Sequence, residues 1–260
     1  MLCNTFATLA QRTWHRMRLS ETTKVLLGET AITSLNLQDL IAKHSAEIDI
    51  VDFSPIVEAR VTGADWEWWF VDGAQAIGFA IQAKRLDGGR YDVGYKPRNY
   101  AYQINTLLRY SWANGLLPLY CWYNYLAPKG GKSYPQYWGC AVADGYSVYQ
   151  HHKRKEYTAG HLLPISVPWH ALACEFDKRS VAGIHHMSHL LRHVQIDTVS
   201  KRYALPRNVG RVDPNPDLLG LPARVRSLLT FKDRIHEGAI LDIPVRQLPR
   251  ALVVVRKARS

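Results

Sequence analysis

The segment that decides the fold reads TGADWEWWFVDGAQAIGFAIQAKR and spans residues 62–85. Its first part, residues 65–71, alternates in polarity. Aromatic side chains share one face, and Asp65 and Glu67 share the other. Successive side chains of a β-strand point to opposite faces of the sheet. The alternation therefore predicts a strand with one aromatic, core-facing side and one acidic side.

A second strand is predicted directly after the first, over residues 76–85. An Asp-Gly pair at residues 72–73 marks the turn between them. Gln82 and Lys84 lie two residues apart in the second strand, so they share a face. Asp65 and Gln82 are 17 residues apart across one turn, a separation that lets antiparallel neighbours lie side by side. The pattern thus predicts that Asp65 and Gln82 meet in the sheet.

The rest of the chain predicts an α/β fold with a mixed central β-sheet flanked by helices. Helical spacing of apolar residues indicates helices over residues 4–18, 20–43, 97–114 and 180–195, with Ser20 as a suitable N-cap of the second. Further strand patterns lie at residues 56–62, 116–125, 137–142 and 252–255. A stretch rich in Pro, Gly and Asn, typical of a loop, covers residues 204–222.

Positive charge is concentrated in the second half of the chain. The 260 residues include 33 Lys and Arg against 22 Asp and Glu, a formal net charge of +11. Residues 1–150 hold 14 and 13 of these, whereas residues 151–260 hold 19 and 9. We therefore expect a core domain over residues 1–145 and a basic C-terminal extension over residues 146–260, packed on the core. A basic region favours a polyanionic partner, nucleic acid before an anionic membrane, although a solvated basic surface explains the charge nearly as well.

The composition is typical of a globular protein from a reducing compartment. Hydrophobic residues make up 47% and charged residues 21% of the chain, which excludes disorder, collagen and coiled coil as the main state. No apolar run reaches the roughly 18 residues of a membrane span, and the first residues lack the pattern of a secretory signal. We expect a cytoplasmic protein with no membrane partner. The four cysteines lack C-x-x-C spacing, which argues against a zinc ribbon and a disulfide framework and favours buried free thiols: Cys3, Cys121, Cys140 and Cys174.

Polar residues among apolar neighbours form a candidate site for metal-dependent chemistry. Glu29 falls on the apolar stripe of its predicted helix, where a buried carboxylate needs a partner. Magnesium takes hard oxygen ligands, typically one or two carboxylates with waters and phosphate oxygens. Asp65, Glu29 and the side-chain oxygen of Gln82 can supply such ligands, and the Ala83 carbonyl can add one. Lys84 can orient the attacking water and offset phosphate charge, which is the chemistry of phosphodiester hydrolysis.

The order of these residues resembles a known superfamily. A helix with Glu29, a strand with Asp65 and the stretch IQAKR at residues 81–85 look like the PD-(D/E)XK restriction-endonuclease-like fold, in the Gln-x-Lys variant of type IV restriction-like enzymes. The stretch TGADWEWW at residues 62–69 is also similar to uncharacterised bacterial proteins thought to belong to that superfamily. The resemblance covers approximately residues 20–125.

The resemblance implies a restriction-endonuclease-like core and a magnesium-dependent endodeoxyribonuclease of restriction or phage defence, with manganese as a substitute ion. Asp65 would be the central metal ligand, Lys84 the motif lysine and Glu29 the additional helix acid. DNA is the implied substrate, with RNA left open, and a homodimer or partner subunits of a defence system are further implied partners. Two positions depart from the pattern. Ala64 replaces the usual proline, and Gln82 stands where most members have a carboxylate, so the site depends more on Asp65 and Glu29.

Two alternatives to an active nuclease stay open. One is an inactive nuclease-fold module that binds nucleic acid or a defence partner. The other is purely structural, with Lys84 snorkelling from a strand edge and Asp65 capping the turn after Gly63. The tryptophans and tyrosines of the strands could stack on bases, but their alternation favours packing in the core.

Several other residues are candidates for binding. Gln103 lies on the edge of its predicted helix and either touches the phosphate backbone or is a surface glutamine. Glu67 shares a face with Asp65 and is either a second metal ligand or an exposed carboxylate. A histidine every four residues, at His185, His189 and His193, indicates a zinc site, phosphate contacts or ordinary histidines. The best phosphate-contact candidates are basic residues of the second half: Lys153, Arg154, Lys155, Lys201, Arg202, Arg207 and Arg211.

Overall fold

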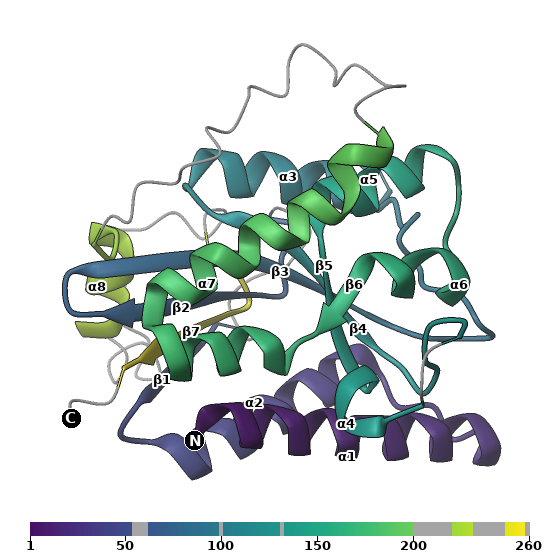
Figure 1. Cartoon of the computed structure of the whole chain (residues 1–260), viewed down its shortest axis with the longest axis horizontal. Helices are drawn as coiled ribbons and strands as arrows, with labels where there is room; N and C mark the ends of the chain where they lie inside the picture. The colour runs from purple at the N-terminus through teal and green to yellow at the C-terminus, as the bar shows by residue number, and fades with distance from the viewer. Residues whose placement is uncertain (54–61, 99–100, 131–132, 200–219, 231–247, 258–260) are drawn as a thin grey trace.

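The described part of the protein is built around one mixed sheet of seven strands with helices on both faces (Figure 1). The computed structural model describes the chain except residues 54–61, 99–100, 131–132, 200–219, 231–247 and 258–260, and the side chains of residues 190 and 192–199. The described strands are β1 (Ile48–Asp52), β2 (Trp66–Asp72), β3 (Gln75–Arg85), β4 (Leu117–Tyr123), β5 (Cys140–Asp144), β6 (Ser166–Pro168) and β7 (Ala251–Arg256). The described helices are α1 (Leu2–Thr23), α2 (Glu29–His44), α3 (Gln103–Ala113), α4 (Pro135–Trp138), α5 (Gly145–Lys153), α6 (Ala159–Leu162), α7 (His170–Val199) and α8 (Ala223–Thr230), with one 3₁₀ turn at Leu163–Ile165.

The strands follow the order β1-β7-β2-β3-β4-β5-β6 across the sheet. β2 and β3 form the predicted antiparallel hairpin, and β2 pairs in parallel with β7, as β3 does with β4. The remaining pairs are antiparallel. The last described strand, β7, therefore lies between β1 and β2, and one sheet contains strands from both sides of residue 145.

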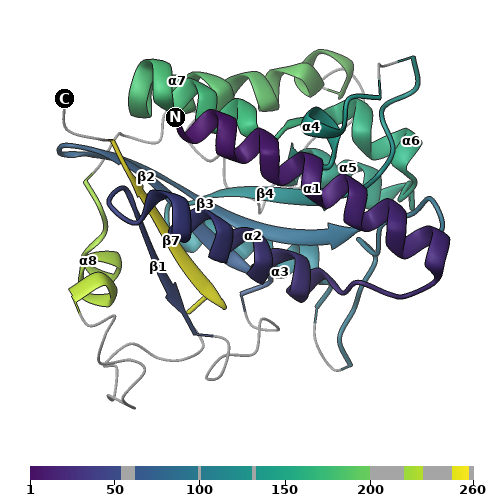
Figure 2. The ribbon, with the colours of Figure 1, turned by 90° about the horizontal axis from the view of Figure 1, so that it is seen from below.

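Different helices cover the two faces of the sheet. α1 lies against α2 and α7 on one face (Figure 2), whereas α3 and α5 pack together over β3, β4 and β5 on the other. The first face buries an aromatic cluster around Trp68, whose ring centre lies 5.4 Å from that of Phe6 and 5.7 Å from that of Trp169. Burying such large rings contributes much of the core's free energy. The expectation that strand aromatics pack in the core is confirmed for Trp66, Trp68 and Trp122, each with 1% or less exposed.

The first two helices differ from the predicted ranges. α1 continues to Thr23, and α2 begins only at Glu29. Ser20 therefore caps no helix. Its hydroxyl donates to the Val25 carbonyl and accepts from the Leu27 N–H, which closes the loop between the helices. Val25 is 71% exposed rather than part of a buried stripe. Glu29 consequently occupies the first turn of α2, not the middle of an apolar face.

The sequence patterns did not predict two short strands, β1 and β6. β1 has five residues and β6 three, too few for alternation to stand out from chance. The strand predicted over residues 137–142 starts later, at Cys140, because a short helix with a proline in its first turn, α4, precedes it. The strand predicted over residues 56–62 falls almost entirely outside the described residues, as does most of the loop predicted over 204–222.

α7 is longer than the helix predicted over residues 180–195. It begins at His170 and bends at Ser180, whose backbone is not helical (φ 59°). The Ser180 hydroxyl donates to the carboxylate of Asp72 at the β2–β3 turn, which ties the bend to the sheet. None of the helices that the structure describes combines the length and apolar composition needed to cross a bilayer.

The cysteines are only partly as expected. Cys121 and Cys140 are buried free thiols. Cys3 and Cys174 instead form a disulfide between α1 and α7, with a Cα–Cα distance of 4.4 Å. The two residues are 171 positions apart, so no local spacing could reveal the pair. Only the packing of α1 on α7 brings them together.

Candidate active site

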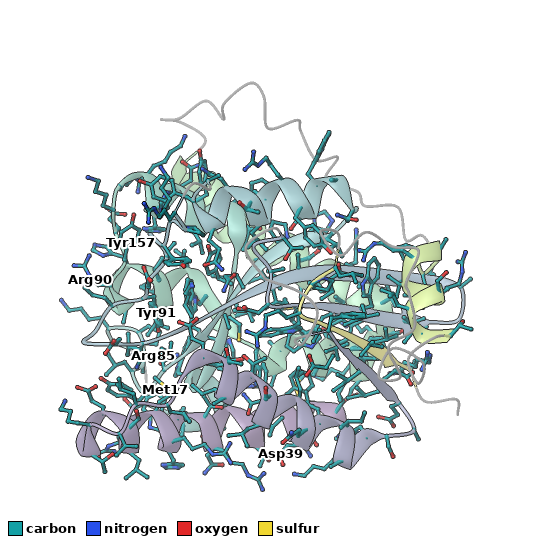
Figure 3. The ribbon with its side chains drawn as sticks, turned by 180° about the vertical axis from the view of Figure 1, so that it is seen from behind. Met17, Asp39, Arg85, Arg90, Tyr91 and Tyr157 are labelled. Carbon is teal, nitrogen blue, oxygen red and sulfur yellow. A yellow bond between two sulfur atoms is a disulfide. The ribbon has the colours of Figure 1, made fainter. Side chains whose placement is uncertain are left out.

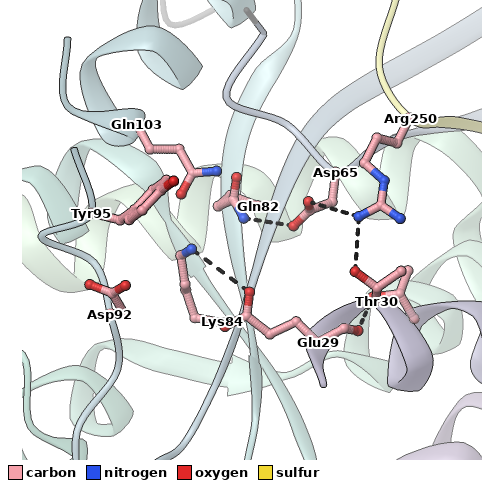
Figure 4. Close-up of a pocket in the computed structure, with 10 residues that line it drawn as sticks. Glu29, Thr30, Asp65, Gln82, Lys84, Asp92, Tyr95, Gln103 and Arg250 are labelled. Atoms are coloured by element: carbon pink, nitrogen blue, oxygen red, sulfur yellow. Dashed lines mark hydrogen bonds and ion pairs between the residues drawn. The ribbon is translucent and has the colours of Figure 1, made fainter. Parts of the chain in front are cut away.

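One cleft, about 420 Å³ in volume, gathers the residues predicted to carry chemistry (Figure 4). It opens beside the start of β2 and the end of β3, and the first turns of α2 and α3 contribute to its walls. The lining residues are Glu29, Thr30, Thr33, Asp65, Gln82, Lys84, Asp92, Tyr95, Gln103 and Arg250.

The turn before β2 fixes the position of Asp65. Gly63 has a positive φ of 68°, and a Cβ there would lie 2.6 Å from the Leu107 nitrogen and 2.7 Å from the Gln103 carbonyl oxygen. Only glycine therefore lets this turn approach the backbone of α3. The Asp65 N–H donates to β3 at Ile81, and the Asp65 carbonyl accepts from the first residue of β7. The backbone of Asp65 is thus held between two strands.

The Asp65 carboxylate meets Gln82, as the strand spacing predicts. Its Oδ2 accepts from Gln82 Nε2 at 2.6 Å and from the Ala83 N–H at 2.8 Å, and its Oδ1 lies 3.9 Å from Arg250 Nη1. Burial raises the pKa of Asp65 to about 6, although the Lys84 charge and the Ala83 N–H act in the opposite direction. A carboxylate desolvated to this extent is better stabilised by an additional cation than by water.

Gln82 presents its amide nitrogen, not its oxygen, to two of the three other groups predicted as ligands. Nε2 donates both to Asp65 Oδ2 and to the Ala83 carbonyl, at 2.6 and 2.9 Å. The Gln82 Oε1 atom is buried and has no hydrogen-bond partner among the described residues. Rotating the amide by half a turn would bring Oε1 towards Asp65, an arrangement that only a cation between the oxygens makes favourable.

Glu29 and Lys84 face each other at the end of β3. Lys84 Nζ lies 3.8 Å from Glu29 Oε2, and Glu29 Oε1 accepts from the Arg85 N–H at 3.2 Å. The Lys84 side chain is only 7% exposed, and its ammonium lies 5.7 Å from the centre of the Tyr95 ring at the cleft wall. The snorkelling alternative is therefore wrong, because the ammonium points into the cleft instead of out to bulk water (Figure 4).

Arg250 is a residue of the cleft that sequence reasoning missed. It directly precedes β7, its Nη1 donates to Thr30 Oγ1 at 3.1 Å, and it faces Asp65 as described above. No local motif marks Arg250 in the sequence. Only the parallel pairing of β7 with β2 brings this end of the chain to the site. Asp92 and Tyr95, from the loop between β3 and α3, were missed for the same lack of a local signal.

Glu67 has neither of its expected roles. It is fully buried, so it is not an exposed carboxylate. It accepts from Trp69 Nε1 at 2.8 Å, from Arg224 Nη2 at 3.0 Å and from the Tyr110 hydroxyl. Both carboxylate oxygens are thus engaged under α3 and α8, outside the cleft, and Glu67 is not a second ligand beside Asp65.

Gln103 begins α3 and lines the cleft, so it is not an ordinary surface glutamine. Its Oε1 atom is buried and lacks a hydrogen-bond partner among the described residues. The basic candidates Lys153, Arg154 and Lys155 are exposed at the end of α5 and do not line the cleft. Four further candidates lie outside the described residues: Lys201, Arg202, Arg207 and Arg211.

The histidine stripe lies on α7, away from the cleft lining. His185 Nε2 and His189 Nε2 are 3.3 Å apart, and the side chain of His193 is outside the described part of the chain. Across the described residues, no three Asp, Glu, His or Cys side chains gather as a ready metal site. A metal ion in the cleft would instead combine two carboxylates with amide and carbonyl oxygens. The buried Gln82 Oε1 without a partner and the desolvated Asp65 carboxylate fit a hard cation such as magnesium.

A comparison with protein families finds one match over nearly the whole chain. The model of a family of unknown function (DUF6615) matches residues 2–259. No curated protein matches the sequence. The match spans both halves of the chain and assigns no activity.

Proposed function

The chain belongs to this family of unknown function (DUF6615), and we propose that it is a metal-dependent endonuclease that hydrolyses DNA phosphodiester bonds. The observation that carries the proposal is the meeting of Asp65, Gln82 and Lys84 with Glu29 in one cleft. We propose in addition that the mixed sheet and its helices form a restriction-endonuclease-like core, and that the enzyme acts in restriction or phage defence. The order of these residues along the chain supports this assignment: the helix acid Glu29, then Asp65, then the Gln-x-Lys stretch at residues 82–84.

Each side chain of the cleft has a distinct role in this proposal. Asp65 and Glu29 would hold magnesium or manganese, with the Ala83 carbonyl and the Gln82 amide oxygen completing the protein ligands. Such an ion supplies positive charge beside a phosphate as its negative charge grows. Lys84 carries three N–H donors in a desolvated position, where they orient an attacking water and offset phosphate charge. Glu29 holds the Lys84 ammonium at the cleft end.

Arg250 is the residue best suited to bind the phosphate itself. Its guanidinium is fixed on one side by Thr30 and is 27% exposed, so further donors remain available for a ligand. Planar guanidinium groups match phosphate oxygens in pairs, whereas lysine offers only a point charge.

The proposal is tested with purified protein, supercoiled plasmid and single-stranded RNA, in magnesium, manganese or chelator. Nicking or linearisation of plasmid that requires the divalent ion supports the endodeoxyribonuclease. Cleavage of RNA but not of DNA would mean that the substrate is RNA and would leave metal-dependent phosphodiester hydrolysis as the reaction. Cleavage that is unchanged in chelator, or no cleavage of either nucleic acid, would contradict the proposal.

Gln82→Glu is expected to strengthen metal binding. The variant places a second carboxylate beside Asp65, so the free protein loses stability by like-charge repulsion and gains more from a divalent cation. We expect the melting temperature to fall in chelator, and the magnesium concentration for half-maximal stabilisation to drop about tenfold, the factor that corresponds to about 1.4 kcal/mol. Thermal melts across a magnesium titration measure both. Equal titration midpoints for the variant and the wild type would argue against an ion beside residue 82.

Arg250→Ala is expected to weaken substrate binding more than turnover. Losing one charge-assisted phosphate contact costs about 1.5–3 kcal/mol, which corresponds to a KM at least about tenfold higher. Arg250→Lys should lie between the two, because it keeps the charge and loses the fork. Steady-state cleavage of a labelled oligonucleotide separates KM from kcat. Arg179→Ala, on the exposed side of α7, is the matched control. An unchanged KM for Arg250→Ala would remove this residue from the substrate site.

The rival function, an inactive module that binds nucleic acid, has one observation in its favour. The Gln82 amide nitrogen already bridges Asp65 Oδ2 and the Ala83 carbonyl, so these two oxygens are satisfied without a metal ion. Under this alternative, wild type and Lys84→Ala would retain DNA equally and cleave nothing. The cleavage assays decide between the two functions.

A further inference from the structure

We propose that a strip of aromatic and basic side chains leading out of the cleft binds unpaired bases, so that the substrate enters as a single strand. The inference rests on the proposed function and specifies the form of nucleic acid that this site takes. The strip consists of Tyr95, Lys96, Tyr102, Tyr149, His152 and Lys153.

The strip begins inside the cleft. Tyr95 lines the cleft wall, 5.7 Å from the Lys84 ammonium, yet the residue is 42% exposed. Its carbonyl accepts from the N–H of Gln103, the first residue of α3, at 3.1 Å. One ring thus faces both the site of chemistry and the solvent.

Tyr102 continues the strip just outside the cleft. It is 40% exposed and directly precedes Gln103. The ammonium of Lys96 lies 5.4 Å from the centre of the Tyr102 ring, and the His152 ring lies 4.9 Å away at a steep angle. A cation beside an exposed ring is suited to a nucleotide, which carries its base and its phosphate about one ring width apart.

The far end of the strip lies on α5, which packs beside α3 (Figure 1). His152 stacks with Tyr149 at 6.3 Å, and the Lys153 ammonium lies 4.9 Å from the centre of the Tyr149 ring. The exposed basic residues that follow α5 extend the positive charge beyond the strip. The rings of Tyr102, His152 and Tyr149 therefore form a row, with the ammonium groups of Lys96 and Lys153 at its two ends.

Hydrogen bonds through Tyr157 connect the loop that carries Tyr95 with the His152 end of the strip. The Tyr91 N–H donates to the Tyr157 carbonyl at 2.9 Å, and the Tyr157 hydroxyl shares a hydrogen bond of 3.1 Å with His152 Nδ1. Figure 3 shows Tyr91 and Tyr157 on the same side of the molecule. The loop that carries Tyr95 is thus tied to α5, so the strip is a preformed surface.

This composition favours a single strand over a duplex. Proteins that bind single strands combine a positive path with aromatic rings on which bases stack, and stacking is tolerant of sequence. In a duplex the base faces are stacked on one another and cannot reach aromatic side chains. A surface that binds the duplex backbone therefore needs basic residues and no exposed rings. The aromatic rings of the described strands are buried, whereas exposed rings occur elsewhere, among them Trp112, Tyr134 and Tyr137. Tyr95 and Tyr102, each at least 40% exposed, differ from those three in position: Tyr95 lines the cleft, and Tyr102 directly precedes the lining residue Gln103. A stacking role accounts for exposed rings at this place.

Binding is measured separately from hydrolysis, on the Asp65→Asn background and in chelator. The probes are a fluorescein-labelled oligothymidylate, an oligouridylate and a duplex of equal length, followed by fluorescence anisotropy. We expect the single strands to bind at least about fivefold more tightly than the duplex, and Tyr95→Leu and Tyr102→Leu each to weaken single-strand binding about tenfold. Tyr102→Phe should bind normally, because it keeps the ring. Tyr134→Leu removes a tyrosine of similar exposure next to α4 and is the matched control.

A second variant tests the strip without touching a ring. Lys96→Ala should reduce the salt dependence of single-strand binding by about one released counterion. Tighter binding of the duplex, or equal effects of Tyr102→Leu and Tyr134→Leu, would overturn the strip. Tyrosine-dependent binding by a protein that cleaves nothing would keep the strip and refute the nuclease. If Tyr95→Leu and Tyr102→Leu both cleave single and double strands as the wild type does, the nuclease is supported and the strip is refuted.

Discussion

Replacing Asp65 by asparagine or Lys84 by alanine is expected to lower the rate of DNA cleavage by about 10³-fold or more, the effect of removing one preorganised charge or metal ligand from an active site. Asp65 is the carboxylate on which the other groups converge, through Gln82, the Ala83 N–H and Arg250. Lys84 is the desolvated cation of the cleft, with 7% of its side chain exposed. Both changes keep the approximate volume or remove atoms at the cleft wall, so the fold should persist.

The measurement is single-turnover cleavage of plasmid, with Asp39→Asn and Lys24→Ala as matched surface controls. Magnesium should raise the melting temperature of the wild type and of Lys84→Ala, and have little effect on Asp65→Asn, because only the last loses a ligand. DNA binding in chelator should survive in both variants. Wild-type cleavage rates in either variant would assign the hydrolysis to another site or to a contaminant.

The β2–β3 hairpin and the meeting of Asp65 with Gln82 could be predicted because their causes are local. Alternating polarity specifies which face each side chain takes, and a single turn fixes the partner strand. The aromatic face of β2 followed from the same rule, since Trp66 and Trp68 lie two residues apart and are both buried.

The parts that could not be predicted depend on pairings between distant segments. Arg250 reaches the cleft only because β7 enters the sheet beside β2. The Cys3–Cys174 disulfide needs α1 to pack on α7. Glu29 does line the cleft, but the reason for predicting it, a place on an apolar stripe, is wrong. Its position in the first turn of α2 directs its carboxylate to the end of β3. Local patterns specify faces and turns, whereas these contacts follow from strand order.

Glu67 illustrates a different limit, since its face was predicted correctly and its partner was not. Glu67 shares a face with Asp65 but comes two residues later in the chain. It therefore lies under α3 and α8, where Tyr110 and Arg224 enclose its carboxylate. Burial and the neighbouring Glu67 carboxylate raise the pKa of Tyr110 well above its usual range, so the phenol remains a hydrogen-bond donor. No pattern within the hairpin distinguishes this buried ion pair from a metal ligand.

Arg224→Met is accordingly expected to destabilise the protein by about 3 kcal/mol, because it leaves the fully buried Glu67 carboxylate without its counter-charge. The figure is at the low end for a broken buried ion pair because 17% of the Arg224 side chain is exposed. Urea denaturation of the variant measures the loss. Combining Arg224→Met with Glu67→Gln should recover most of the lost stability, since the neutral amide can still accept from Tyr110 and Trp69.

The control for this prediction lies on the same helix. Arg226 is exposed, and its replacement by alanine should change the free energy of unfolding by no more than about 0.5 kcal/mol. If Arg224→Met unfolds at the same urea concentration as the wild type, Glu67 is either protonated or reached by water, and the docking of α8 does not depend on the ion pair. If the double variant is less stable than Arg224→Met alone, the carboxylate itself, not its pairing with Arg224, stabilises the contact of α3 with β2.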